Sequence, residues 1–209
     1  MADRRLLMIG IAATVGVLLG GGIYLTQQSA GDRYAQCRQG VVAGGLDSFG
    51  TDFTLTRADG QRVTNEQVFD KPSLLYFGYT FCPDVCPLDT ARNAEVVDIL
   101  QQQGHDIQSV FITVDPRRDT PQVLADYASL FSDDMIALTG SDDEIAAVNR
   151  GWRNVFQRHD QEDKEFYLVD HMTHSYLVMP GTETVEFFRR DAEAEPMAER
   201  VGCFMNARG

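Results

Sequence analysis

Two cysteines near the middle of this 209-residue chain, Cys82 and Cys86, have the residue type and spacing for chemistry. They end the segment 76–87, YFGYTFCPDVCP, whose apolar and aromatic first half is typical of a buried strand. A helical pattern follows, so both thiols should lie near the N–H groups that open a helix, where partial positive charge favours thiolate. Thiolates are nucleophiles and soft metal ligands, so the pair indicates a redox centre or a metal site.

The spacing of the pair is Cys-x-x-x-Cys, one residue longer than the usual Cys-x-x-Cys redox motif. With Pro83 between the cysteines and Pro87 after them, the two sulfurs can still converge on one point. Convergent sulfurs can close a disulfide or bind a soft ion. Two sulfurs alone rarely satisfy a biological metal, so a metal site would need a third ligand.

The third ligand is sought among the four histidines. His105 follows a helix-ending glycine and His159 lies in an acidic, polar hairpin, so both are expected in solvent. His171 and His174 stand where a late strand begins, and such a loop can approach the cysteine motif. In an extended segment they point to opposite faces, so both would not serve one site. Two sulfurs and an imidazole suit copper best, although zinc with an added water is also acceptable.

The surrounding pattern predicts strands that alternate with helices. The expected strands are 49–55, 61–63, 73–80, 107–114, 135–138, 175–179 and 183–188, with a hairpin from 155–158 and 166–169; the expected helices are 64–69, 87–104, 121–131, 142–149 and 192–201. Strands that alternate with long helices imply parallel crossovers, and the closing hairpin adds antiparallel strands. The predicted fold is therefore an α/β, three-layer sandwich with a mixed sheet. The redox-type motif after an early strand makes it thioredoxin-like.

The N-terminus indicates export. Residues 6–25 carry no charge and, as a helix, would span about 30 Å, the thickness of a bilayer core. Arg4 and Arg5 precede them and favour a cytoplasmic N-terminus. We interpret 1–25 as a membrane anchor, 26–48 as a periplasmic tether and 49–203 as the folded domain. A cleaved signal peptide is the alternative.

Export also bears on the other two cysteines and on the charge of the chain. In an oxidising compartment Cys37 and Cys203, near the two ends of the soluble part, could form a disulfide or remain unpaired thiols. The net charge of −13 argues against nucleic-acid binding, which needs a basic face. It suits solubility, or docking to a basic partner or a cation.

Three ordered motifs resemble the Sco/SenC family. They are the cysteine segment 76–87, the segment 114–121 (VDPRRDTP) and the segment 169–177, which begins Val-Asp-His and ends Tyr-Leu. The resemblance runs from about Phe49 to Phe188 and includes the N-terminal anchor. It implies a membrane-tethered, thioredoxin-like copper protein of the inner membrane, with its domain in the periplasm.

The resemblance also implies a role and a set of ligands. Family members deliver copper to the binuclear copper centre of cytochrome c oxidase, or reduce the cysteines that receive it. The ligands carried over are Cys82, Cys86 and His171. Expected partners are the copper-binding subunit of the oxidase and, further, other periplasmic copper chaperones or thiol reductants. His174 departs from the apolar residues usual between the histidine and Tyr-Leu, and is either a substitute ligand or an outward polar residue.

Two enzymes compete with the copper chaperone as interpretations. A thiol–disulfide reductase would use Cys82 and Cys86 as a redox pair, with copper incidental. A peroxidase of the same fold would need an activated cysteine beside a threonine and an arginine, for which Thr80 and Arg92 are loosely placed. The sequence does not choose between copper donor and thiol reductant, because both use the same sulfurs.

Overall fold

The computed structural model describes residues 32–38, 45–46, 48–160, 163 and 165–208. The strands are β1 (Thr54–Arg57), β2 (Arg62–Thr64), β3 (Ser73–Gly78), β4 (Gln108–Thr113), β5 (Ile136–Thr139), β6 (Phe156–Arg158), β7 (Val169–His171), β8 (Ser175–Met179) and β9 (Glu183–Phe188). The helices are α2 (Asn65–Val68), α3 (Val85–Gln102), α4 (Pro121–Ser129), α5 (Asp142–Gly151) and α6 (Ala194–Arg208). No helix within these residues is long and apolar enough to cross a membrane. The predicted anchor, 1–25, lies outside the described residues.

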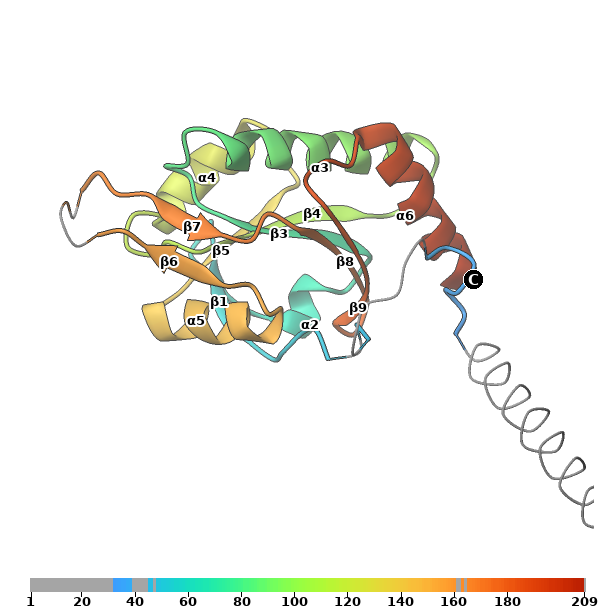
Figure 1. The fold of residues 1–209 in the computed structure, drawn as a ribbon, viewed down its shortest axis with the longest axis horizontal. Coiled ribbons are helices and arrows are strands. Elements are labelled where there is room, and N and C mark those ends of the chain that lie inside the picture. The colour runs from blue at the N-terminus through green and yellow to red at the C-terminus, as the bar shows by residue number, and fades with distance from the viewer. Residues whose placement is uncertain (1–31, 39–44, 47, 161–162, 164, 209) are drawn as a thin grey trace, which may run out of the picture.

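Seven strands form one mixed sheet in the order β2-β1-β5-β4-β3-β8-β9. Strands β3, β4 and β5 are parallel, whereas β1 and β8 run antiparallel to their neighbours. Helices α3 and α4 lie on one side of the sheet and α2 and α5 on the other (Figure 1). The predicted three-layer α/β sandwich with a mixed sheet is confirmed. The strands β6 and β7 form a separate two-stranded sheet.

Local sequence explains several helix ends. Thr64 and Ser141 each close a capping box with the third helical residue, Gln67 and Glu144 respectively. Thr120 caps α4, as predicted, and Pro121 is its first residue. These side chains satisfy N–H groups that have no partner inside the helix, which fixes where each helix begins.

Several predicted boundaries were wrong. The second hairpin strand, expected at 166–169, is β7 at Val169–His171, and the last helix, expected at 192–201, extends to Arg208. The first strand was expected from position 49 but begins at Thr54, because Gly50 has φ +116°, a conformation that interrupts an extended chain. Pro87 was expected as the first residue of α3, which instead begins at Val85. A proline at the third position costs no hydrogen bond either, because the first turn of a helix has no internal acceptors for its N–H groups.

The disulfide left open by the sequence is present, between Cys37 and Cys203. It joins residues 166 positions apart and ties the segment 32–38 to α6. Tyr34 is buried in the same place, with its ring 5.5 Å from that of Phe204. This part of the predicted tether therefore packs on the folded domain.

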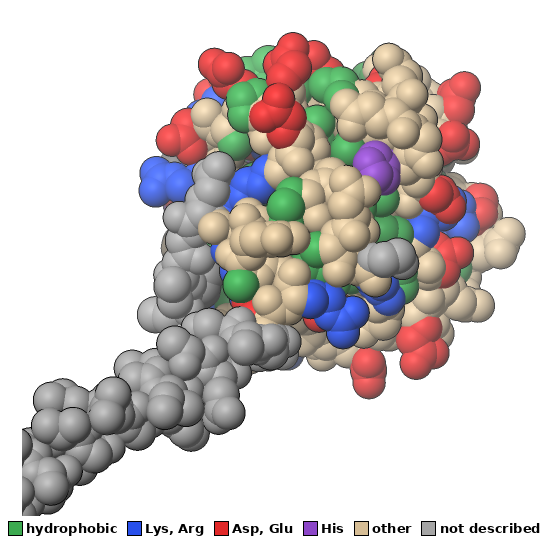
Figure 2. Space-filling model, turned by 90° about the vertical axis from the view of Figure 1, so that its right-hand side faces the viewer, with side chains coloured by type: hydrophobic (Ala, Val, Ile, Leu, Met, Phe, Trp, Pro, Cys, Tyr) green, Lys and Arg blue, Asp and Glu red, His purple; other side chains and the backbone are tan. Residues whose placement is uncertain are grey.

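The acidity of the chain is spread rather than concentrated. Figure 2 views the molecule from the right-hand side of Figure 1, and acidic side chains ring this face with basic ones between them. Several acidic residues are engaged in ion pairs, such as Asp106 with Lys71 and Glu186 with Arg200. On this face the charge has the distribution expected for solubility.

The disulfide yields the first prediction. Replacing both Cys37 and Cys203 by serine should lower the free energy of unfolding by about 2–4 kcal/mol, because the cross-link restricts a long loop of the unfolded chain. Urea unfolding followed by the fluorescence of buried Trp152 measures it. The matched control replaces Cys82 and Cys86 by serine, which leaves the cross-link intact and should cost less. An unchanged midpoint in the first variant would contradict the prediction.

Candidate metal centre

The cysteine loop lies at the carboxyl ends of the central parallel strands, between β3 and α3. Strands β3 and β4 are buried along their whole length, so the loop stands on a rigid base. Carboxyl ends of parallel strands are where α/β sheets place binding sites. Cys82 keeps 9% of its surface exposed, whereas Cys86 is fully buried. Solvent therefore reaches the pair from the Cys82 side.

The two sulfurs have opposite acid–base character. The backbone N–H of Cys86 donates to Cys82 Sγ over 3.4 Å. The pKa of Cys82 is lowered, first by a side-chain hydrogen bond from Cys86 and further by His171 and by backbone N–H groups of the helix start. The pKa of Cys86 is raised, because it is the donor of that bond and is buried. In the reduced pair Cys82 is the thiolate and Cys86 keeps its proton.

His171 reaches the pair from the far end of the chain. Its Nε2 lies 3.2 Å from Cys86 Sγ, across 85 positions of sequence. Its Nδ1 lies 3.0 Å from the carbonyl oxygen of Met172, which can only accept, so Nδ1 carries the proton. Nε2 is then left with a lone pair directed at the sulfur, the arrangement that suits a metal-binding histidine. The rings of Tyr76 and Tyr79 pack edge-on against the imidazole at 6.1 and 5.9 Å.

The donor set fits a soft metal ion. The three side chains offer two sulfurs and one imidazole nitrogen, which is the chemistry that copper prefers. In the described part of the chain, no three His, Cys, Asp or Glu side chains form a preassembled metal site. The Cys86 thiol instead lies between Cys82 Sγ and His171 Nε2, and its one proton can be donated to either. A metal would displace that proton.

A buried carboxylate fixes the cysteine loop from behind. Asp119 is fully buried and accepts hydrogen bonds from the N–H and the hydroxyl of Thr80, at 3.1 and 2.6 Å, and from the hydroxyl of Thr113 at 2.5 Å. Asp119 thus joins the ends of two neighbouring strands, since Thr113 ends β4 and Thr80 follows β3.

A second buried acid, Asp89, lies one helical turn beyond Cys86 and was not predicted. The hydroxyl of Tyr76 donates to Asp89 over 3.0 Å, and Arg92 lies 3.5 Å from the same carboxylate. Burial raises the pKa of Asp89, and Arg92 opposes that effect. Only the three-residue step from Cys86 to Asp89 along α3 could have indicated that this acid faces inward.

The other histidines lie elsewhere. His174 is half-buried with its ring 5.0 Å from that of Phe187, and burial lowers its pKa. His159 is exposed and lies 2.7 Å from Asp170, so this carboxylate is directed at His159 and away from the sulfurs. Of the two histidines that spacing left open, the structure brings His171 to the cysteines.

The residues considered for a peroxidase have structural partners. Thr80 is bonded to Asp119, as above. Arg92 donates to the carbonyl oxygen of Arg190 and to the hydroxyl of Ser175, and packs beside Asp89. Phe81, expected beneath the loop together with Tyr79, is instead half exposed.

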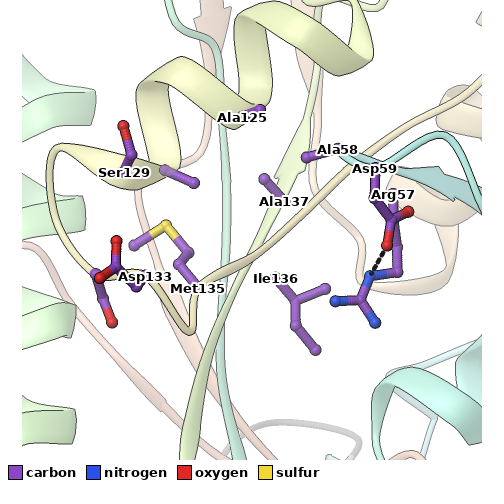
Figure 3. A pocket seen from close by; sticks show the side chains of 11 residues that line it. Arg57, Ala58, Asp59, Ala125, Ser129, Asp133, Met135, Ile136 and Ala137 are labelled. Carbon is purple, nitrogen blue, oxygen red and sulfur yellow. Dashed lines mark ion pairs between the residues drawn. The ribbon is translucent and has the colours of Figure 1, made fainter.

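A cavity of about 280 Å³ lies away from the cysteines, between α4 and the turn after β1. Figure 3 shows small alanine side chains, Ala58, Ala125 and Ala137, facing one another across it, with the Arg57–Asp59 ion pair at its edge. Neither a cysteine nor a histidine lines it. Its lining offers one soft ligand, the thioether of Met135, with no second one beside it.

Comparison with known proteins agrees with the geometry. The family model SCO1/SenC matches residues 43–206, a range that holds Cys82, Cys86 and His171. The chain belongs to the SCO1/SenC family. It is 45% identical to Protein SenC of Rhodobacter capsulatus over 176 residues, which cover 84% of this chain and 79% of SenC.

Solved SCO1/SenC structures share the fold. The crystal structure of Arabidopsis thaliana ScoI with copper bound is 36% identical, with a TM-score of 0.71, over 76% of this chain and 99% of that one. Yeast Sco1 with copper bound is 30% identical, with a TM-score of 0.72, over 76% of this chain and 89% of that one. The thioredoxin-like fold expected from the position of the cysteine motif is thus the Sco fold.

Asp119 gives the second prediction. Burial raises its pKa to about 6, above the ordinary range of an aspartic acid, so the fold favours the protonated acid. The protonated Asp119 contributes at most about 3 kcal/mol to the free energy of unfolding. This contribution is complete below about pH 4 and is lost as the pH rises through 6. The stability difference between wild type and Asp119→Asn should fall by that amount between pH 4 and 6 and then level off. Chemical unfolding at several pH values measures it.

The control for this experiment is Asp106→Asn, at an exposed carboxylate. The free energy of unfolding of this variant should stay within about 1 kcal/mol of the wild-type value across the same pH range. A flat difference for Asp119→Asn would contradict the prediction.

Proposed function

We propose that this protein is a copper chaperone that binds copper through Cys82, Cys86 and His171 and assists assembly of the binuclear copper centre of cytochrome c oxidase. The observation that carries the proposal is the 3.2 Å approach of His171 Nε2 to Cys86 Sγ, which adds an imidazole to the cysteine pair. Copper-bound relatives of the same fold support it. Copper is the cargo here, so the site must both hold and release it.

The geometry suits loading and release. Cys82 is already a thiolate and is the more exposed sulfur, so it is the first donor that incoming copper meets. Cys86 loses its proton as the ion binds, and His171 contributes Nε2 without having to lose one. Thiol–disulfide exchange with an external disulfide would oxidise the pair to a Cys82–Cys86 disulfide, with the two electrons leaving in the two thiols of the reduced partner. Both sulfur ligands are lost in this step, which would release the ion.

We propose the inner membrane as the location, with residues 1–25 as a single-pass anchor and the domain in the periplasm. The uncharged segment 6–25 after Arg4 and Arg5 supports it. The disulfide between Cys37 and Cys203 suits an oxidising compartment. The proposed partner is the copper-binding subunit of the oxidase, together with periplasmic chaperones or reductants that load the site.

The second candidate is a thiol–disulfide reductase that keeps the acceptor's cysteines reduced. The opposite pKa shifts of the two sulfurs favour it, because Cys82 is a nucleophilic thiolate while Cys86 keeps its proton. Cys82 thiolate would attack the acceptor disulfide and form a mixed disulfide. Cys86 would then attack Cys82, releasing the acceptor as two thiols. Two electrons pass from the pair to the acceptor, and the pair ends as a disulfide. His171 has no covalent part in these steps.

The third prediction tests the ligands. Cys82→Ser, Cys86→Ser and His171→Ala should each weaken copper binding by more than about 100-fold, because loss of a ligand exceeds the usual effect of loss of its supporting hydrogen bond. Titration of the reduced protein with copper against a competing chelator measures it. His174→Ala is the matched control, since that half-buried imidazole packs on Phe187, and it should bind as wild type does. Stoichiometric, tight binding by all three ligand variants would end the assignment.

The fourth prediction separates donor from reductant. His171→Ala should lose copper transfer to an apo copper-acceptor domain, while it still reduces that domain's disulfide at a rate within about threefold of wild type. Cys82→Ser should lose both activities. If His171→Ala assembles the copper centre of the acceptor normally, the reductase becomes the function.

A further inference from the structure

Arg118 lies where three segments of the metal centre meet. Its side chain is 11% exposed. The guanidinium carbon lies 3.6 Å from the ring centroid of Tyr167, 4.9 Å from that of Phe81 and 5.7 Å from that of Tyr79. Two of these rings belong to the cysteine loop, and Tyr167 belongs to the segment that leads into β7. One cation thus contacts both sides of the candidate site.

The buried carboxylate of Asp115 bonds to both Arg118 and Tyr167. Asp115 is fully buried, and its two oxygens are shared between Arg118 Nε at 2.5 Å and the hydroxyl of Tyr167 at 2.7 Å. Arg118 Nη1 also donates to the carbonyl oxygen of Glu165 at 3.3 Å. Arg118 therefore bonds the segment before β7 directly, and through Asp115 it fixes the ring on which it stacks.

The strand that carries His171, β7, is held near the cysteine loop by side-chain contacts. Its short sheet, β6–β7, is not hydrogen-bonded to the seven-stranded sheet in the described residues. The cysteine loop, by contrast, extends directly from β3. Besides Arg118, the hydroxyl of Tyr79 accepts from the N–H of Val169 over 3.3 Å, and the ring of Tyr79 packs against His171. Side chains, and not a backbone ladder, hold the histidine near the sulfurs.

We propose that Arg118 is a positioning residue that fastens the strand bearing His171 to the cysteine loop, and so decides whether copper is held by three ligands or by the two sulfurs alone. The copper part of this inference rests on the proposed function; the fastening of the strand does not. Arginine fits the role because a flat guanidinium can stack on an aromatic ring while its edge donates to a carboxylate and a carbonyl.

The principal variant is Arg118→Leu combined with Asp115→Asn. The amide still accepts from Tyr167 and avoids a buried, unpaired carboxylate that would unfold the chain. The double variant is compared with Asp115→Asn alone, so that the difference reports the loss of Arg118. Arg117→Ala is the matched control, because Arg117 is the adjacent arginine but is half exposed and pairs only with the surface acids Asp142 and Asp160.

The first measurement uses the full chain without metal. Backbone amide exchange across 165–171 should be at least about tenfold faster in the double variant than in Asp115→Asn, with exchange in β3 and β4 unchanged. Arg118→Lys keeps the charge but loses the planar group, so it should raise exchange over the same residues. Exchange across 165–171 equal to that of Arg117→Ala would overturn the proposal.

The second measurement uses copper-loaded protein. X-ray absorption at the copper edge should show a lower nitrogen contribution in the double variant, and copper affinity should fall about 10–100-fold, as it does when other ligand-orienting groups are lost. Full nitrogen ligation in the double variant would also overturn the proposal. If wild type itself binds no copper, the proposed function fails, and the exchange experiment still decides the role of Arg118.

Discussion

The hydrogen bond between Cys86 and His171 is the contact on which the rest of the site depends. It joins a helix start to a strand 85 positions later, and neither residue is near the other in local structure. It exists because β3 lies inside the sheet, between parallel β4 and antiparallel β8. The loop after β3 and the segment before β8 therefore emerge at the same edge. A different strand order would leave two sulfurs without a nitrogen.

Around that contact, regular secondary structure positions the cysteines, whereas side-chain contacts position the histidine. The cysteine side is built from regular elements: a fully buried strand, a helix start and a carboxylate, Asp119, that ties Thr80 to β4. The histidine side is a small separate sheet held by Arg118, Asp115 and the tyrosines. A rigid half and a second half fastened by side chains suit the proposed role, in which the protein both retains and gives up an ion.

Much of the fold could be predicted from the sequence because its signals are local. Apolar runs of strand length predicted β3, β4 and β8, and their alternation with helices predicted the sandwich. The first strand was misplaced because its alternation continues through Gly50, whose φ only the folded chain reveals. In the site, spacing alone could not choose between His171 and His174; the family resemblance did, and tertiary packing agrees. The roles of Arg118 and Asp89 depend on residues far away in the chain, so no local pattern shows them.

The disulfide between Cys37 and Cys203 has a consequence for maintenance of the site. Four cysteines can pair in three ways, and the structure has Cys37 and Cys203 oxidised while Cys82 and Cys86 are free thiols. In the proposed role, a reductant that regenerates the Cys82 and Cys86 thiols must leave the other bond intact in the same molecule. Packing holds that bond together, because Cys37 is buried in one cluster with Tyr34 and Phe204, against which Cys203 packs. The fold thus lets one chain carry two thiol pairs at different redox states: packing keeps the sulfurs of the outer pair together, whereas the inner pair includes the reactive Cys82 thiolate.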